Sequence, residues 1–232
     1  MLTKSGNKPK SLVLAYVSIF AALNALADFV PFTPILGIAE ASFRLGWIMS
    51  TLTGILLGAK AGGISCLIGG LIGISLGQPP IFGFYTPLRP AISAFIAGML
   101  VSRSWHIPAL SLSALISVWL LLPTGRDASM VLIFHVVGLA VVILLRGKIG
   151  ALVESKDSYK VSWGFFFVAY CGNISRHLLG SVFSATFLNV PSIVFITAMP
   201  YTLVEQLTFA VATMIMGMSL NHLGLRYLLQ QS

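Results

Sequence analysis

Eight long apolar runs are the feature of this 232-residue sequence that most constrains its fold. A helix needs about 20 mostly apolar residues, roughly 17 to 25, to span the hydrocarbon core of a bilayer. The runs predict an all-α integral membrane protein, a polytopic helical bundle. Because several of them are short for a complete span, we expect six to eight transmembrane helices. The runs are Leu12–Val30, Phe43–Leu57, Ala61–Leu76, Arg89–Val101, Ile107–Leu122, Ala128–Leu145, Ser162–Leu188 and Ser192–Leu220.

The composition excludes most soluble classes of protein. Only 9% of the residues are charged and 57% are hydrophobic, with a mean hydropathy of +0.95, whereas soluble chains carry about a quarter charged residues. A cytosolic enzyme, a secreted disulfide scaffold and a disordered tail are therefore excluded. Cys66 and Cys171 each lie inside an apolar run and are interpreted as small hydrophobic residues. The net charge of +8 comes from scattered residues rather than a dense basic run, so no nucleic-acid partner is expected.

Lysine and arginine residues between the runs predict the orientation, because cytoplasmic loops carry an excess of them. With eight alternating spans and a cytoplasmic start, ten basic residues lie inside and three outside. We expect a multi-pass protein of the cell membrane with both termini in the cytoplasm. It forms a single domain, 1–232, with a cytoplasmic tail at 1–11 and a cytoplasmic loop at 146–160. The inside set is Lys4, Lys8, Lys10, Lys60, Arg103, Arg146, Lys148, Lys156, Lys160 and Arg226, and the outside set is Arg44, Arg89 and Arg126.

Two outer segments and one pair of runs are unusual in composition. Pro31–Ser42 and Gly77–Leu88 are rich in proline, glycine and aromatic residues rather than in charge. Two interpretations stay open for them: lids that fold back over the bundle or a ligand, and plain connecting loops. The runs Phe43–Leu57 and Ala61–Leu76 carry glycines at spacings of three and four, which lets helices approach closely. We expect these two to form a tight buried hairpin.

Polar residues inside the runs indicate a binding site, because an ionisable group within a span is costly and needs a function or a partner. Asn173, Arg176 and His177 share one helix face, being three and four residues apart. The other polar residues that we expect in the binding site fall in the outer half of the bundle or at its outer rim, where Glu40 also lies. The expected substrate-binding residues are Asn24, Asp28, Arg44, Arg89, Asn173, Arg176, His177, Tyr201 and Glu205.

A structural interpretation of the same residues stays open beside this one. Arg176 with Glu205, and Asp28 with Arg44 or Arg89, are possible ion pairs that only fix helix register. What favours a shared site is that all of these residues occur at a similar depth.

Catalysis has little support in the sequence. There is no H-E-x-x-H, no Walker A sequence and no cluster of His, Cys and acidic residues at metal-ligand spacing. We therefore predict a non-enzyme with no catalytic residue, no cofactor and no metal site. A pocket lined by a few polar groups favours binding and translocation of a small solute.

Several passages resemble one family of membrane proteins. They are Ser18–Ala27, the loop Phe32–Gly37, Gly54–Gly62 running into Ile68–Gly73, Phe82–Ala91, His177–Ser181 and Pro200–Glu205. Together they spread over most of the chain and resemble the S components, the substrate-binding membrane subunits, of energy-coupling factor (ECF) transporters. The resemblance is to archaeal-type members of unassigned substrate.

The resemblance implies a bundle that captures a vitamin, cofactor precursor or other micronutrient from outside. Its partners would be a coupling transmembrane subunit and two cytosolic ATPase subunits, with membrane lipid around it. The docking surface would be an alanine face of the first helix, formed by Ala15, Ala21, Ala22 and Ala25, although internal packing explains small residues there equally well.

Two departures from the family pattern are visible. An S component has six core helices where this chain has eight runs, and an acidic residue tends to precede the late histidine where this chain has Arg176. An arginine there favours an anionic substrate, since guanidinium groups suit carboxylates and phosphates.

Two alternative functions stay open. The first is a membrane-embedded enzyme for a lipid or prenyl substrate, with Arg176 and His177 near a lipid phosphate and Glu205 as acid or base. The second is a secondary carrier that works without partners.

Overall fold

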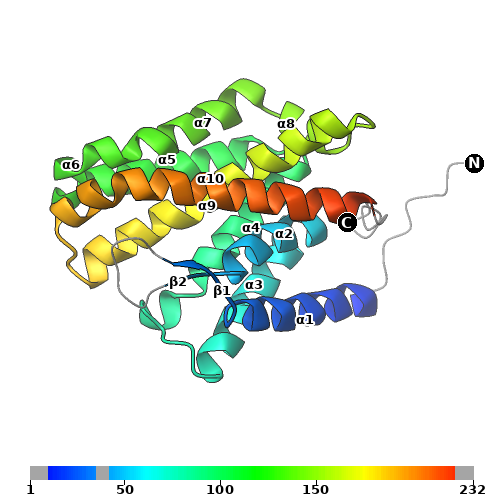
Figure 1. The fold of residues 1–232 in the computed structure, drawn as a ribbon, viewed down its shortest axis with the longest axis horizontal. Helices are drawn as coiled ribbons and strands as arrows, with labels where there is room; N and C mark the ends of the chain where they lie inside the picture. The colour runs from blue at the N-terminus through cyan, green and yellow to red at the C-terminus, as the bar shows by residue number, and fades with distance from the viewer. Residues whose placement is uncertain (1–9, 35–41, 223–232) are drawn as a thin grey trace, which may run out of the picture.

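The computed structural model describes residues 10–34 and 42–222 as a bundle of helices (Figure 1). The long helices alternate in direction along the chain, so that their ends gather at two opposite ends of the bundle. The helices are α1 (Lys10–Ala27), α2 (Gly46–Leu57), α3 (Ala59–Ser75), α4 (Leu88–Val101), α5 (His106–Leu121), α6 (Pro123–Asp127), α7 (Ile133–Leu145), α8 (Lys148–Val153), α9 (Ser158–Phe187) and α10 (Ser192–His222), with short 3-10 turns η1 (Gly83–Tyr85) and η2 (Ser129–Leu132).

The expectation of a helical fold is confirmed, since each of the eight apolar runs corresponds to a helix whose ends differ by a few residues. The short helices α6 and α8 were not expected. Within the part of the chain that the structure describes, two helical stretches, Gly83–Val101 and Ser192–Asn221, are long and apolar enough to cross a membrane by length and composition, whereas several other apolar helices have only 10–17 residues. One or two such helices are weak evidence, so the polytopic membrane arrangement stays a prediction.

A two-stranded ribbon follows α1, where the sequence indicated a lid or loop. Strand β1 (Pro31–Pro34) pairs antiparallel with β2 (Ser42–Arg44). The Leu45 N–H also donates to the Val30 carbonyl at 2.9 Å. Proline is tolerated in such a strand because an edge position needs no inward N–H donor. The remainder of the predicted lid, residues 35–41 with Glu40, lies outside the described residues, as do the tail residues 1–9 and Arg226.

Glycine allows α2, α3 and α4 to approach to backbone contact, as expected from the spacing. A Cβ atom on Gly54 would overlap the Ala94 carbonyl of α4, and one on Gly62 would lie 2.8 Å from the Gly54 Cα. A Cβ on Gly69 would lie 2.6 Å from the Ala21 carbonyl of α1. These seams of small residues replace the interdigitating side chains of an ordinary core.

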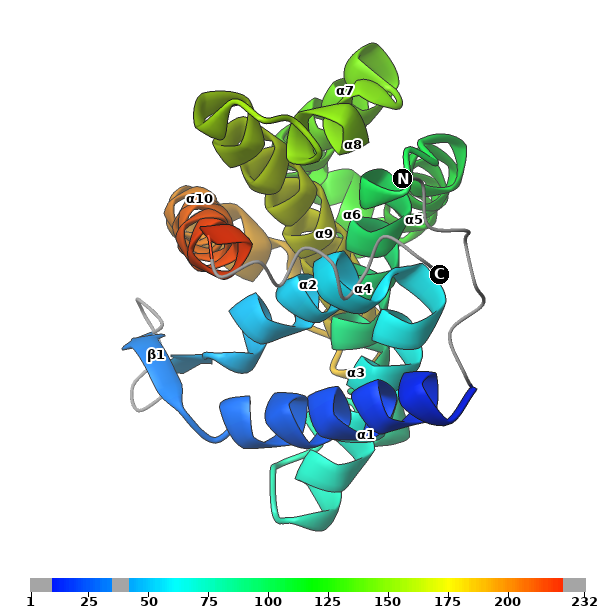
Figure 2. The same cartoon turned by 90° about the vertical axis from the view of Figure 1, so that its right-hand side faces the viewer.

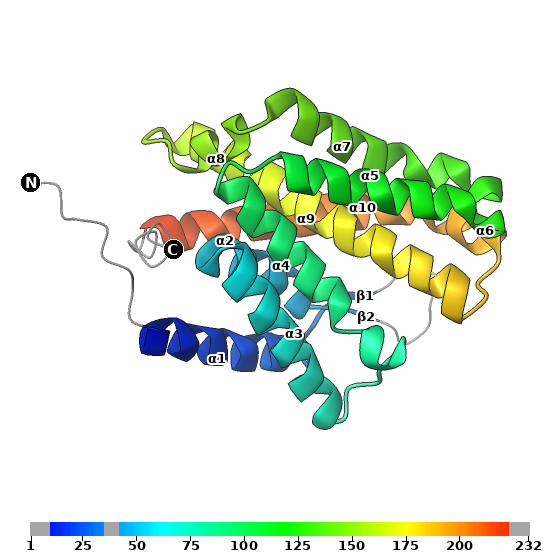
Figure 3. The same cartoon turned by 180° about the vertical axis from the view of Figure 1, so that it is seen from behind.

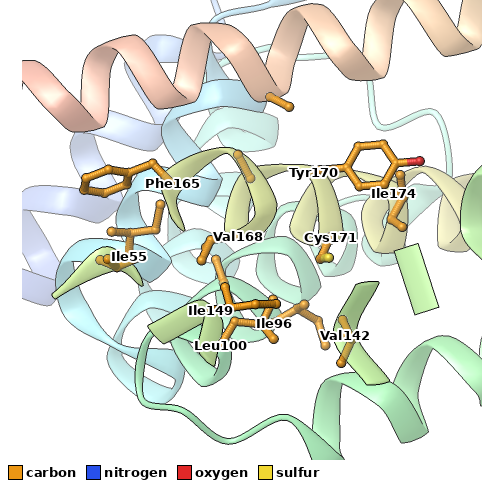
Figure 4. Packing of buried hydrophobic residues seen from close by; sticks show 14 of the residues in the cluster. Ile55, Ile96, Leu100, Val142, Ile149, Phe165, Val168, Tyr170, Cys171 and Ile174 are labelled. Carbon is orange, nitrogen blue, oxygen red and sulfur yellow. The ribbon is translucent and has the colours of Figure 1, made fainter. Parts of the chain in front are cut away.

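The centre of the bundle is formed by α2, α4 and α9. Seen along the bundle, α1 and α3 lie on one side, and α5, α7 and α10 surround α9 on the other (Figure 2). The main hydrophobic cluster joins Ile96 and Leu100 of α4 to Val168 and Ile174 of α9 (Figure 4). The Tyr170 hydroxyl donates to the Phe134 carbonyl at 2.9 Å, so its one polar atom is satisfied within this apolar region.

The distribution of polarity on α3 is inverted relative to a soluble protein. Its buried residues are Gly62, Ser65, Cys66, Gly69, Gly70 and Gly73. Its exposed face instead carries the large aliphatic side chains Ile64, Ile68, Leu71, Ile72 and Leu76. Exposed aliphatic residues also cover α1 and α10. A surface of this kind marks contact with an apolar environment or partner.

The two ends of the bundle differ in character. The α2–α3 junction, where Lys60 lies in the first turn of α3, the turns that contain Arg103 and Arg146, and α8 lie at the end where α1 begins (Figure 3). Arg103 forms an ion pair with Glu154 there. Helix α6 and the turn between α9 and α10 lie at the opposite end, and the strands lie nearer the middle of the bundle, beyond the end of α1.

The α2–α4 seam predicts different consequences for two glycine substitutions. Gly54→Ala should lower the free energy of unfolding by about 1–3 kcal/mol because the new methyl group overlaps the α4 backbone. In a chain of this size, that corresponds to a fall in Tm of about 2–4 °C per kcal/mol.

Gly63→Ala is the matched control, because its Cβ would lie 3.6 Å from the Ala91 carbonyl, an ordinary contact. The Tm of this variant should equal that of the unsubstituted protein or lie slightly above it, because alanine favours a helix more than glycine does. Equal loss of Tm in both variants would contradict the seam.

Candidate functional site

A cavity of about 470 Å³ lies in the half of the bundle away from α8, since its lining includes Asp28, which follows α1, and Val190, which lies between α9 and α10. Its volume is in the range of small-molecule binding sites. The walls come from Asp28 directly after α1, from the starts of α2 and α4, and from parts of α3, α9 and α10. Six of the nine expected site residues line it: Asp28, Arg44, Arg89, Arg176, His177 and Glu205.

Arg176 is the most buried charged group of the cavity, with 4% of its surface exposed. Its Nη1 donates to the Ser50 hydroxyl at 3.0 Å and to the Gly46 carbonyl at 3.5 Å. Its Nε has no hydrogen-bond partner within residues 10–34 and 42–222. Burial of a guanidinium group is costly unless its donors and charge are compensated.

Trp47 joins two of the arginines. The Cζ atoms of Arg176 and Arg89 lie 4.2 Å and 5.1 Å from the centroid of its ring, and Arg89 also lies 5.5 Å from that of Phe82. Such cation–π contacts stabilise a desolvated guanidinium and fix its plane. The sequence analysis missed Trp47. Its only signal is an aromatic residue three positions after Arg44, which is too common to identify a site.

Glycines make room for two of the charged side chains. A Cβ atom on Gly180 would lie 2.7 Å from the Arg89 Nε, and one on Gly46 would overlap the Asp28 carboxylate. The glycines in α9 and α2 therefore shape the cavity as well as the helix packing.

The ion pairs that would fix helix register do not form among the described residues, where Arg103–Glu154 is the one ion pair within 4 Å. Arg44 donates through Nη1 to the backbone carbonyl of Asp28 at 2.7 Å, and not to its carboxylate. Asp28 still interacts electrostatically with Arg176, Arg44 and Arg89. The charged residues that line the cavity therefore do not form ion pairs with each other.

Three expected site residues lie elsewhere. Asn24 donates to the Thr53 hydroxyl at 2.8 Å, and Asn173 accepts from the Thr51 hydroxyl at 3.1 Å, so both tie helices together inside the bundle. Tyr201 is 46% exposed and does not line the cavity. Helix α9 is surrounded by neighbours, so residues that share its face still meet different helices.

His177 has a partner that the sequence analysis left without a role. Its Nδ1 lies 3.3 Å from the Nε2 of His135, which is buried at the start of α7. The His135 Nδ1 faces the Val131 carbonyl at 3.3 Å, so this nitrogen carries the proton and the His135 Nε2 accepts from His177. The two histidines are 42 positions apart in the sequence, so no local motif reveals the pair.

The segment Gly77–Leu88 folds over the cavity, which favours the lid interpretation. Gln78, Phe82 and Thr86 line the cavity. Phe82 is buried and lies 5.6 Å, centroid to centroid, from Phe183 of α9. Tyr85 stacks on Phe187 at 5.3 Å.

One enzyme-like pattern escaped the sequence analysis. Residues Gly73-Ile-Ser-Leu-Gly77 match G-x-S-x-G, the nucleophile elbow of hydrolases, which requires a strand-to-helix turn. Ser75 instead lies in the last turn of α3, exposed, and donates to the Leu71 carbonyl at 3.0 Å. The geometry of an elbow is therefore not present.

The expected docking face on α1 is divided. Ala21 and Ala25 are each 1% exposed, and Ala21 packs against Gly69 of α3. These two residues serve internal packing, which the sequence analysis left as the alternative to docking. Ala15 and Ala22 are exposed and keep the docking prediction open.

The comparisons with known proteins leave the function open. The chain is similar to an uncharacterized protein of Methanocaldococcus jannaschii, with 27% identity over 164 residues. The match covers 70% of this chain and 55% of that protein, so the chain spans about half the length of the relative. No protein-family model matches the chain, and no solved structure matches it.

The contact between Ser50 and Arg176 predicts a stability effect. Ser50→Ala should lower the free energy of unfolding by about 1.5–3 kcal/mol, because it removes a hydrogen bond to a buried charged donor. Thermal unfolding of the purified protein measures the effect.

Ser75→Ala is the control, since that hydroxyl is exposed and bonds only within its own helix turn. It should change the free energy of unfolding by less than about 0.5 kcal/mol. A Ser50→Ala variant as stable as the control would show that Arg176 does not depend on this hydrogen bond.

Proposed function

We propose that this protein is the substrate-binding membrane subunit of an ECF-type importer. It captures a micronutrient such as a vitamin or cofactor precursor from outside for ATP-driven uptake by partner subunits, and it is not itself an enzyme. The observation that carries the proposal is the cavity of about 470 Å³ at one end of an apolar helical bundle, lined by charged side chains that are not paired with each other.

The placement in a membrane is supported by the distribution of polarity. Large aliphatic side chains are exposed along α1, α3 and α10, whereas Ser65, Asn173 and Arg176 are buried. Lys60, Arg103 and Arg146 lie at the α2–α3, α4–α5 and α7–α8 junctions, none of which lines the cavity, as the positive-inside rule requires if the cavity faces outward. The proposed bundle is polytopic, with both termini in the cytoplasm.

The exposed face of α1 supports docking of the coupling subunit. Ala15 and Ala22 lie two helical turns apart on this face, and small side chains allow close and reversible contact between helices in lipid. The opposite, buried face of the same helix packs against α3.

Transport into proteoliposomes tests the proposal. The chain should retain a small molecule when purified alone, and should import it only with a coupling subunit, two ATPase subunits and ATP. Uptake by the chain alone would instead establish a secondary carrier. Turnover of a lipid that stops in Glu205→Gln, with lipid binding kept, would establish the enzyme alternative.

If the exposed face of α1 docks the partner, a substitution there should affect partner binding and leave small-molecule binding unchanged. Ala22→Phe should reduce co-purification of the coupling and ATPase subunits at least tenfold, because a ring on this face prevents close helix contact. Binding of the retained molecule should not change.

Leu207→Phe serves as the control, since it adds a ring to an exposed aliphatic position on α10. It should leave both measurements unchanged. Loss of partner binding in both variants would assign docking to a broader surface than α1.

A further inference from the structure

The unpartnered atoms of the cavity identify the chemistry of its ligand. Among the described residues that line it, three buried side-chain atoms lack a hydrogen-bond partner: Gln78 Nε2, Arg89 Nε and Arg176 Nε. All three are donors. We propose that the ligand is an amphipathic anion, with a carboxylate or phosphate group held by Arg89 and Arg176 and an apolar body in the remainder of the cavity. The inference rests on the proposed function in that the cavity is taken as the binding site.

The charge balance of the cavity favours an anion. Three arginines line it, against the two carboxylates of Asp28 and Glu205, which leaves one positive charge when both acids are ionised. Arg89 and Arg176 also repel each other, and Asp28 is the acidic residue that acts on both. An anion between the two guanidinium groups relieves this repulsion.

The geometry of the arginines suits recognition rather than simple packing. Trp47 lies against both guanidinium groups and Phe82 lies against that of Arg89. Each guanidinium group keeps its Nε–H without a hydrogen-bond partner among the described residues, and the planar donors of a guanidinium match a carboxylate or phosphate. Gly180 supplies the space in which Arg89 adopts this position.

The rest of the wall accommodates an apolar body. It includes Ile74, Ile81, Val190, Val194 and Phe195. A small inorganic anion would leave most of a 470 Å³ cavity without contacts. The combination of donors at one side and aliphatic or aromatic residues around them fits a molecule with one charged group.

The experiment begins with the molecule retained by the full-length protein purified in detergent. It is extracted into aqueous and organic phases and weighed by mass spectrometry in both ion polarities. Protein stripped of that molecule is then titrated with 1-naphthoate, 1-naphthyl phosphate and the neutral 1-naphthamide, with tryptophan fluorescence as the readout. We expect a retained anion, and at least tenfold tighter binding of one of the charged probes than of the amide.

Three variants and a control separate the site from a general charge effect. Arg176→Gln and Arg89→Gln should each lower the affinity for the charged probe at least tenfold, since each removes a charge-assisted contact. Gly180→Ala keeps every charge but displaces the Arg89 guanidinium, so it should weaken binding similarly even if Arg176→Gln fails to fold. Arg126→Gln removes an exposed arginine outside the cavity and should have no effect.

Each outcome has a distinct meaning. A neutral or cationic retained molecule, or no binding of the charged probes, would overturn the anion assignment and leave the transport proposal standing. An anion retained by protein that supports no partner-dependent uptake would overturn transport and keep the assignment. An arginine-dependent phospholipid in the organic phase would keep the anion chemistry and identify a lipid, rather than a soluble nutrient, as its source.

Discussion

The burial of the Arg176 guanidinium is the constraint on which the organisation of this end of the bundle depends. A cation with 4% of its surface exposed loses most of its hydration, so the surrounding helices must compensate it. Helix α2 does so with the Ser50 hydroxyl, the Gly46 carbonyl and the face of Trp47. Asp28 at the end of α1 adds an opposite charge. The start of α2 and the end of α1 are thus positioned around one side chain of α9, and all three segments contribute to the wall of the cavity.

Small residues make this arrangement possible. The glycine seams bring α2, α3 and α4 to backbone contact, which places the start of α2 directly beside α9. Wider helix separations would put Ser50 and Trp47 out of reach of Arg176. Gly46 and Gly180 have the same effect locally, since each leaves the volume that a charged side chain occupies. Packing and recognition therefore use the same kind of residue, for the same steric reason.

The sequence predicts the helices well because a period of apolar residues is a local property. Six of the nine residues that it predicts for a site line one cavity, since charges inside apolar runs are rare and costly. It fails where the deciding partner is distant in the chain. Asn24 forms a hydrogen bond with Thr53, and Asn173 forms one with Thr51, so their polar side chains connect helices inside the bundle. Trp47 is part of the cavity wall beside Arg176, and His135 contacts His177. These contacts are not visible in the local sequence. The pairing of β1 with β2 is equally non-local.

Helix α1 belongs both to the cavity and to the proposed docking surface. Its end carries Asp28, which responds to the charge of Arg176 and Arg89. Its buried face is tied to the bundle by Asn24, which donates to Thr53 and also accepts from the Cys66 thiol at 3.6 Å. Its opposite face presents Ala15 and Ala22 to the exterior. An anion that competes with Asp28 for the two arginines changes the electrostatic attraction that holds this end of α1 against the cavity. Because the helix is continuous from Lys10 to Ala27, such a change acts on the same rigid element that the proposed partner contacts, which gives ligand binding a physical route to the docking surface.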